Sequence, residues 1–182
     1  MPEKIYKIGI IGAGVIADFH AQAIQAMDNA QLVGAYARRQ QKADSFSLQY
    51  GCKGYSDLSD FLAHEDMDVV TIASVSGVHL EHVSAAAHAG KHIICEKPLE
   101  VTPERVDEMI SVCEENQVTL SGIFPRRFNH STHIFKEAID TGRLGKVVLC
   151  DTAIKWWRTQ EYYDSGAWRG TWDLDGGGAL MN

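Results

Sequence analysis

Three adjacent residues, Glu96-Lys97-Pro98, follow a short apolar run and include the side chain best suited to chemistry in this chain. A lysine at the carboxyl end of a buried parallel strand would face the crevice in which ligands of such sheets bind. There its ammonium group could hydrogen-bond a hydroxyl group and stabilise negative charge that develops on that oxygen during a reaction. The alternative is a surface lysine paired with Glu96, and spacing alone favours that alternative.

A second informative pattern, GAGVIA at residues 12–17, directly follows the apolar run 5–11. Gly12 permits a tight turn, Gly14 lets the backbone approach phosphates, and Ala17 is the small residue at which helix and strand pack. The helix that starts here would point unpaired N–H groups and its positive dipole end at an anion. The residues expected to bind a dinucleotide are Gly12, Gly14, Val15, Ile16 and Ala17. A tight strand-helix turn without a ligand is the alternative.

The end of the second apolar run, Tyr36-Ala37-Arg38-Arg39, bears on the choice of cofactor. A site for NAD usually has Asp or Glu here, which accepts hydrogen bonds from the ribose hydroxyls. Ala37 takes that position in this chain, and the two guanidinium groups of Arg38 and Arg39 could pair with a 2′-phosphate instead. The sequence therefore predicts NADP(H) in preference to NAD(H), with solvated loop charges as the alternative.

Further candidates follow the fourth apolar run. Ser74 and Ser76 are small enough to let a cofactor lie across a strand end, and we count them and His79 among the cofactor-binding residues. His79 and His82 lie one helical turn apart, but no carboxylate or cysteine completes a metal set, so no metal is expected. The remaining histidines are expected to be polar packing or surface groups, namely His20, His64, His88, His92, His130 and His133.

The elements that must position these residues alternate through residues 1–124, as in a doubly wound parallel sheet. Strands are expected near residues 5–11, 32–36, 53–55, 69–73, 92–95 and 118–123. Helices are expected at residues 15–26, 40–50, 56–63, 78–89 and 102–116, with Ser56 capping the third and Thr102-Pro103 opening the last. We interpret 1–124 as an α/β dinucleotide-binding domain of the Rossmann type.

The pattern changes after residue 124, and residues 125–182 read as the beginning of an α+β open-sheet substrate domain. A helix is expected at 131–141, followed by one long strand at 146–158 and a glycine- and aromatic-rich tail. One strand and a glycine loop cannot form a self-sufficient core, so this second domain is expected to be incomplete. An exposed strand at 146–158 could instead pair edge to edge with another chain.

Composition indicates a globular protein of the cytoplasm. The 182 residues are 45% hydrophobic, which suffices for a core, and 17 basic against 24 acidic side chains give a net charge of −7. This balance argues against nucleic-acid binding, and we find neither a membrane-spanning run nor a signal peptide. The cysteines lack metal-like spacing and are expected to be reduced packing residues: Cys52, Cys95, Cys113 and Cys150.

The motifs resemble those of the glucose-fructose oxidoreductase/inositol dehydrogenase (Gfo/Idh/MocA) family. The matching segments are residues 9–17, 89–99 (AGKHIICEKPL), 168–169 (WR) and 176–180 (GGGAL), in the same order, and 89–99 is the most specific. The resemblance implies an NAD(P)-dependent dehydrogenase or reductase that transfers hydride between nicotinamide and a sugar, polyol or nucleotide-sugar. It also implies a homo-oligomer formed through the sheet of the second domain.

The same resemblance assigns individual roles. Lys97 would be catalytic and would contact cofactor and substrate, Glu96 would adjoin the cofactor, and the bond before Pro98 could be cis. Trp168 and Arg169 would cover the nicotinamide, and Arg169 would also steady the substrate. Asn182 stands where the family commonly has a substrate-binding carboxylate, and the family's catalytic histidine would fall four positions beyond it. A catalytically incomplete dinucleotide-binding fragment is therefore the alternative function.

Overall fold

The computed structural model describes residues 4–177, and its body is a six-stranded parallel sheet with the order β3-β2-β1-β4-β5-β6. The strands are β1 (Tyr6–Ile11), β2 (Ala30–Tyr36), β3 (Lys53–Tyr55), β4 (Val69–Ile72), β5 (His92–Cys95) and β6 (Leu120–Gly122). The strand order reverses between β1 and β4, and ligands of such sheets bind at the carboxyl ends of the strands at this point. The predicted Rossmann-type α/β fold is confirmed.

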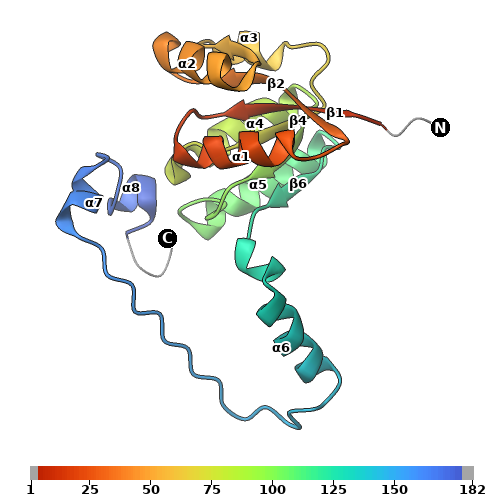
Figure 1. Ribbon diagram of the computed structural model, residues 1–182, viewed down its shortest axis with the longest axis vertical. Helices are drawn as coiled ribbons and strands as arrows, with labels where there is room; N and C mark the ends of the chain where they lie inside the picture. The colour runs from red at the N-terminus through yellow and green to blue at the C-terminus, as the bar shows by residue number, and fades with distance from the viewer. Residues whose placement is uncertain (1–3, 178–182) are drawn as a thin grey trace.

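Helices flank this sheet (Figure 1): α1 (Val15–Gln25), α2 (Gln40–Tyr50), α3 (Leu58–Leu62), α4 (His79–His88) and α5 (Pro103–Glu115). Ile8 and Ile10 of β1 pack in one buried cluster with side chains of α1 and α2. Ile11 points to the other face and packs in a cluster with side chains of α3, α4 and α5. Burial on both faces explains why β1 is a continuous apolar run rather than an alternating one.

Local signals set several helix ends as predicted. The Thr102 hydroxyl caps α5 by accepting a hydrogen bond from the backbone N–H of Arg105, and Pro103 occupies the first turn. Gly51 ends α2 in the left-handed conformation, with φ of 69°, which a residue without Cβ adopts at little cost.

The cap of α3 differs from the prediction. The carboxylate of Asp57, rather than the hydroxyl of Ser56, accepts the N–H of Asp60 at 3.0 Å. Ser56 instead donates its hydroxyl to the side chain of Gln40. Both residue types are good caps, so the local sequence did not distinguish the two registers.

The chain leaves the sheet after β6 through a short 3₁₀ turn, η2 (Pro125–Phe128), and helix α6 (His130–Asp140). Figure 1 shows α6 extending away from the sheet and the following chain returning to two short helices, α7 (Gln160–Asp164) and α8 (Trp172–Asp175). No helix within residues 4–177 is long and apolar enough to cross a membrane.

The predicted strand at 146–158 is wrong. The chain there has no regular secondary structure, and Val148, Leu149 and Trp157 are more than four-fifths exposed, at 86%, 81% and 84%. A strand needs a neighbour to complete its backbone hydrogen bonds, and no strand of the described residues lies beside this segment. The Val, Ile and Trp residues of this segment do favour a strand, but none of the described strands pairs with it.

Candidate functional site

The glycine loop between β1 and α1 has the geometry of an anion cradle. Gly12 has φ of +115°, and a Cβ added there would lie 2.6 Å from the backbone oxygen of Ala73. A Cβ added at Gly14 would meet nothing within 4 Å, so space is open directly before α1. Val15, the first residue of the helix, is 73% exposed, whereas Ala17 is fully buried against the sheet. Exposed N–H groups at the start of a helix, next to open space, fit the phosphates of a dinucleotide.

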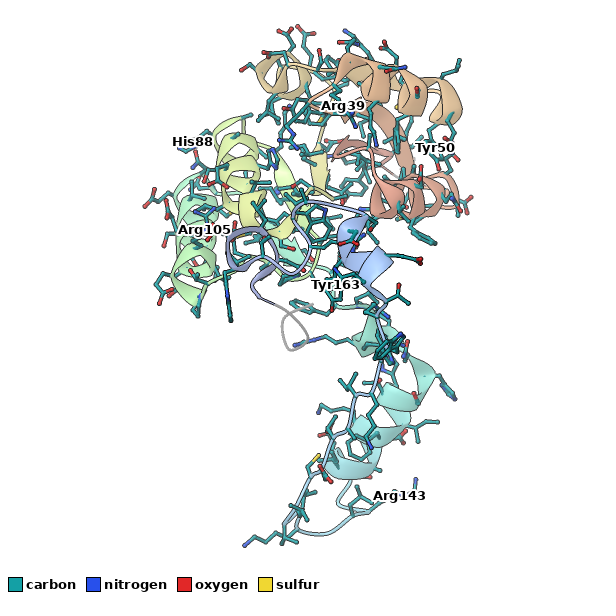
Figure 2. All side chains as sticks on the ribbon, turned by 90° about the vertical axis from the view of Figure 1, so that its left-hand side faces the viewer. Arg39, Tyr50, His88, Arg105, Arg143 and Tyr163 are labelled. Carbon is teal, nitrogen blue, oxygen red and sulfur yellow. The ribbon has the colours of Figure 1, made fainter. Side chains whose placement is uncertain are left out.

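Two arginines lie at the carboxyl end of the neighbouring strand β2. The backbone N–H of Gly12 donates to Tyr36 O at 2.9 Å, which joins the glycine loop to this strand end. Ala37 is buried, whereas Arg38 and Arg39 are exposed. Figure 2 shows Arg39 at the end of the body that is far from α6. The two arginines therefore lie beside the glycine loop, at the same carboxyl edge of the sheet.

The segment after β4 is held by two histidines. The ring of His79, 1% exposed, lies with Nε2 3.2 Å from Ser74 O and with Nδ1 3.0 Å from Pro98 O. It therefore joins this segment to the turn after β5 and can act on a ligand only through these loops. His82 Nδ1 lies 2.9 Å from Ser74 Oγ. Burial, together with the nearby His79 and the Arg38 guanidinium, lowers the pKa of His82 to about 4, so this imidazole is neutral at pH 7.

The predicted catalytic lysine follows β5 directly. The Lys97–Pro98 peptide bond is cis, as the resemblance implied, and the Lys97 backbone N–H donates to Glu96 Oε2 at 2.9 Å. The other Glu96 oxygen lies 2.9 Å from His20 Nε2. Burial alone would raise the pKa of the Glu96 carboxyl, but the hydrogen bonds from His20 and Lys97 outweigh it and hold this pKa below its ordinary value. Glu96 is thus a carboxylate at neutral pH.

Sequence reasoning missed the role of His20 in this group. The sequence predicts only a polar packing or surface role for His20, because no carboxylate or cysteine completes a metal set with the histidines. Its Nδ1 also lies 2.6 Å from the hydroxyl of Thr71 in β4. No sequence spacing indicates this contact, since α1, β4 and the turn after β5 meet only in the folded sheet.

A second buried carboxylate fixes the turn that carries Lys97. Glu100 is 2% exposed and accepts the backbone N–H groups of Leu80, at 3.1 Å, and Val101, at 2.7 Å. The Arg105 guanidinium pairs with it at 3.0 Å. Burial alone would raise the pKa of Glu100, but the hydrogen bonds from Arg105, Val101 and Leu80 prevail and keep it below its ordinary value. Glu100 therefore anchors the start of α4 to this turn.

We expect Glu100→Gln to lower the free energy of unfolding by about 2–3 kcal/mol at pH 7, because the buried pair with Arg105 is lost. The pKa of the Glu100 carboxyl is lower in the folded than in the unfolded chain, so the carboxylate stabilises the fold at pH values above the unfolded-state pKa. This stabilisation is lost as the pH falls through the folded-state pKa. The difference between parent and variant should therefore shrink below about pH 4. Urea unfolding at pH 7 and pH 3.5 measures it. Glu108→Gln, an exposed change on α5, the helix that carries Arg105, is the control; an equal loss in both variants contradicts the assignment.

The tail packs on the segment after β4 through α8. A Cβ added at Gly77 would lie 2.0 Å from Asp173 O, so α8 rests directly on the short 3₁₀ turn η1 (Ser76–Val78). The Arg169 guanidinium lies over the rings of Tyr162, 4.3 Å from the centroid, and Trp168, at 4.7 Å. Figure 2 shows Tyr163 in the same short stretch, between the sheet and α6.

The structure thus brings the glycine loop, the two arginines, the segment after β4 and the Glu96-Lys97 turn to the carboxyl ends of adjacent strands. Ser76, 6% exposed, and His79 lie buried beneath this edge. Contacts of Trp168 and Arg169 with cofactor or substrate stay predictions, and Asn182 lies outside the described residues. No cluster of three or more potential metal ligands is found within residues 4–177.

The chain matches two family models. Residues 6–124 match the oxidoreductase family with an NAD-binding Rossmann fold, and residues 133–182 match the GFO/IDH/MocA C-terminal domain. Fold and match define the class as an NAD-binding Rossmann oxidoreductase. The chain belongs to the Gfo/Idh/MocA family, as its motifs predicted.

Three proteins that are similar to this chain are dehydrogenases. Glucose-6-phosphate 3-dehydrogenase of Bacillus subtilis is 35% identical over 142 residues, 78% of this chain and 40% of that protein. WlbA dehydrogenase of Bordetella pertussis, solved with NADH and UDP-GlcNAcA, has a TM-score of 0.90 at 34% identity, over 98% of this chain and 55% of that one. Scyllo-inositol dehydrogenase of Lactobacillus casei, solved with NAD(H) and scyllo-inositol, has a TM-score of 0.72 at 32% identity, over 78% of this chain and 43% of that one. This chain therefore spans between 40% and 55% of these relatives.

Proposed function

We propose that this chain carries the dinucleotide site and the catalytic lysine of an oxidoreductase. The enzyme would transfer hydride between NAD(P) and a CH–OH carbon of a sugar, polyol or nucleotide-sugar. The observation that carries the proposal is the placement of the glycine loop after β1 and of Lys97 after β5, on either side of β4, at one edge of the sheet. Residues 1–124 would bind the cofactor, and residues 125–182 would begin the substrate domain.

The residues present fit a dinucleotide because the open space at Gly14 lies before the exposed start of α1. When bound, the nicotinamide would supply or accept the hydride. The pyrophosphate would be held by backbone groups of the loop Gly12–Ala17. Ser74, Ser76 and the ring of His79 would form or support the surface on the β4 side.

Hydride transfer changes the charge on the substrate oxygen, so the site needs a group that stabilises this charge. The Lys97 ammonium would donate a hydrogen bond to that oxygen and stabilise the negative charge that develops on it. Glu96, whose two oxygens are already hydrogen-bonded, would orient the turn rather than transfer a proton. Arg169 and Asn182 would hold other hydroxyl groups, and Trp168 would cover the ring.

A titration of the chain with NADPH and NADH, followed by tryptophan emission, tests the proposal. Binding of either cofactor, with turnover of a sugar or polyol, supports the oxidoreductase. Binding without turnover favours the alternative, a catalytically incomplete dinucleotide-binding fragment. No response to either cofactor would overturn both proposals, because the glycine loop would then be a ligand-free turn.

We further propose a preference for NADP(H), since Arg38 and Arg39 are exposed at the end of β2 and Ala37 offers no carboxylate to a ribose. Replacing both arginines by alanine should weaken NADPH binding about 10- to 100-fold, through loss of charge-assisted hydrogen bonds worth roughly 1.5–3 kcal/mol. NADH affinity should change by less than about threefold. Calorimetric titration of both cofactors measures this. Tighter binding of NADH than NADPH by the parent would refute the preference.

The remaining proposals concern assembly and location. The exposed apolar segment 146–158 favours a homo-oligomer formed through the second domain, which light scattering would measure. We place the protein in the cytoplasm, where its free cysteines Cys52, Cys95, Cys113 and Cys150 would stay reduced.

A further inference from the structure

His20 lies in the second turn of α1, the helix that starts at the glycine loop. Both nitrogens of its ring are engaged: Nδ1 lies 2.6 Å from Thr71 Oγ1, and Nε2 lies 2.9 Å from Glu96 Oε1. The Nε2 proton is donated to the carboxylate, and the Thr71 hydroxyl, which can donate or accept, satisfies Nδ1. These two contacts fix the orientation of the ring.

Glu96 links His20 to Lys97. Its Oε1 faces His20, while its Oε2 accepts the backbone N–H of Lys97 at 2.9 Å. The His20 and Glu96 side chains are only 11% and 13% exposed, so water competes weakly for the bond between them. A displacement of His20 would therefore move the Glu96 carboxylate and, with it, the backbone of Lys97.

We propose that His20 is a positioning residue: through Glu96, it fixes the Lys97 backbone relative to the helix that begins at the dinucleotide loop. The effect of His20 on catalysis rests on the function proposed above. The hydrogen-bonded link from His20 through Glu96 to Lys97 is present in the folded chain whether or not that function holds. It gives one helix two tasks, since its first turn faces the cofactor and its second turn places the lysine.

Two substitutions of His20 test the contacts of its two ring nitrogens one at a time. The side-chain amide of glutamine takes about the place of Nε2, so His20→Gln keeps a donor toward Glu96 and loses the contact with Thr71. The amide of asparagine takes about the place of Nδ1, so His20→Asn keeps Thr71 and loses Glu96. The control is His88→Asn, on the exposed surface of α4 (Figure 2).

The first readout is the ¹H–¹⁵N signal of the Lys97 amide, which a carboxylate acceptor shifts downfield. His20→Asn should move this signal upfield, His20→Gln should leave it near the parent position, and His88→Asn should not affect it. Glu96→Gln, which replaces the charged acceptor by a neutral one, should also move it upfield. A signal that stays at the parent position in His20→Asn, or that moves equally in the Asn and Gln variants, overturns the proposal.

The second readout is turnover. A small displacement of a catalytic group costs up to about a hundredfold in rate, so His20→Asn should lower kcat by about tenfold to a hundredfold. His20→Gln should recover most of that loss, and NADPH affinity should be similar in both variants. A parent without turnover would count against the proposed function only, since the Lys97 amide still reports the linkage. Equal kcat losses in both variants would overturn the positioning role.

Discussion

Replacing Lys97 by alanine should lower kcat with the preferred sugar or polyol by about 10³-fold, the range expected when a group that stabilises developing charge is removed. The loss should fall mainly on kcat, because the ammonium interacts more strongly with the oxyanion of the transition state than with a neutral hydroxyl. Initial rates over a range of alcohol-substrate concentrations, with saturating NADP⁺ as the hydride acceptor, measure the effect.

Two controls make the Lys97 result specific. Lys97→Ala should bind NADPH with an affinity close to the parent, because the phosphates are held by the loop after β1 and not by the turn after β5. Lys97→Arg keeps the charge but changes its shape, and should recover only part of the rate. An alanine variant as active as the parent would show that Lys97 is a surface lysine.

The sheet could be predicted because its strands are buried on both faces. Ile8 and Ile10 of β1 face one set of helices and Ile11 faces the other, so the apolar run is continuous and visible in the sequence. Helix starts such as Thr102-Pro103 depend on neighbours within one turn and are therefore equally visible.

Other features depend on residues that are distant in sequence. The contact of His20 with Glu96 joins positions 76 residues apart, and the packing of α8 on Gly77 joins the tail to the turn after β4. Helices α7 and α8 were missed because they are very short, although their caps, Thr159 and Thr171, are ordinary signals. The segment 146–158 shows the converse error, because strand propensity cannot supply the partner that a strand requires.

The glycine loop offers a test that separates folding from binding. Gly12→Ala places a methyl group on a residue with φ of +115°, 2.6 Å from the backbone oxygen of Ala73. Both neighbours of this methyl group are backbone segments, which cannot move aside without cost. We expect this variant to lose about 2–3 kcal/mol of unfolding free energy, as is typical of a strained backbone position. Urea unfolding measures this loss, and NADPH binding should fall with it because the turn before α1 is displaced.

Gly14→Ala is the matched variant, because its methyl group meets no protein atom within 4 Å and its φ of −109° suits any residue. Its stability should stay within about 0.5 kcal/mol of the parent, the usual range for a harmless surface change. Its affinity for NADPH should nevertheless fall by about a hundredfold, because the methyl group occupies the space before α1 that the phosphates need. Fluorescence titration alongside urea unfolding gives both quantities on one sample. A Gly14→Ala variant that binds NADPH as tightly as the parent would mean that the cofactor does not approach this loop, and the proposed dinucleotide site would be wrong.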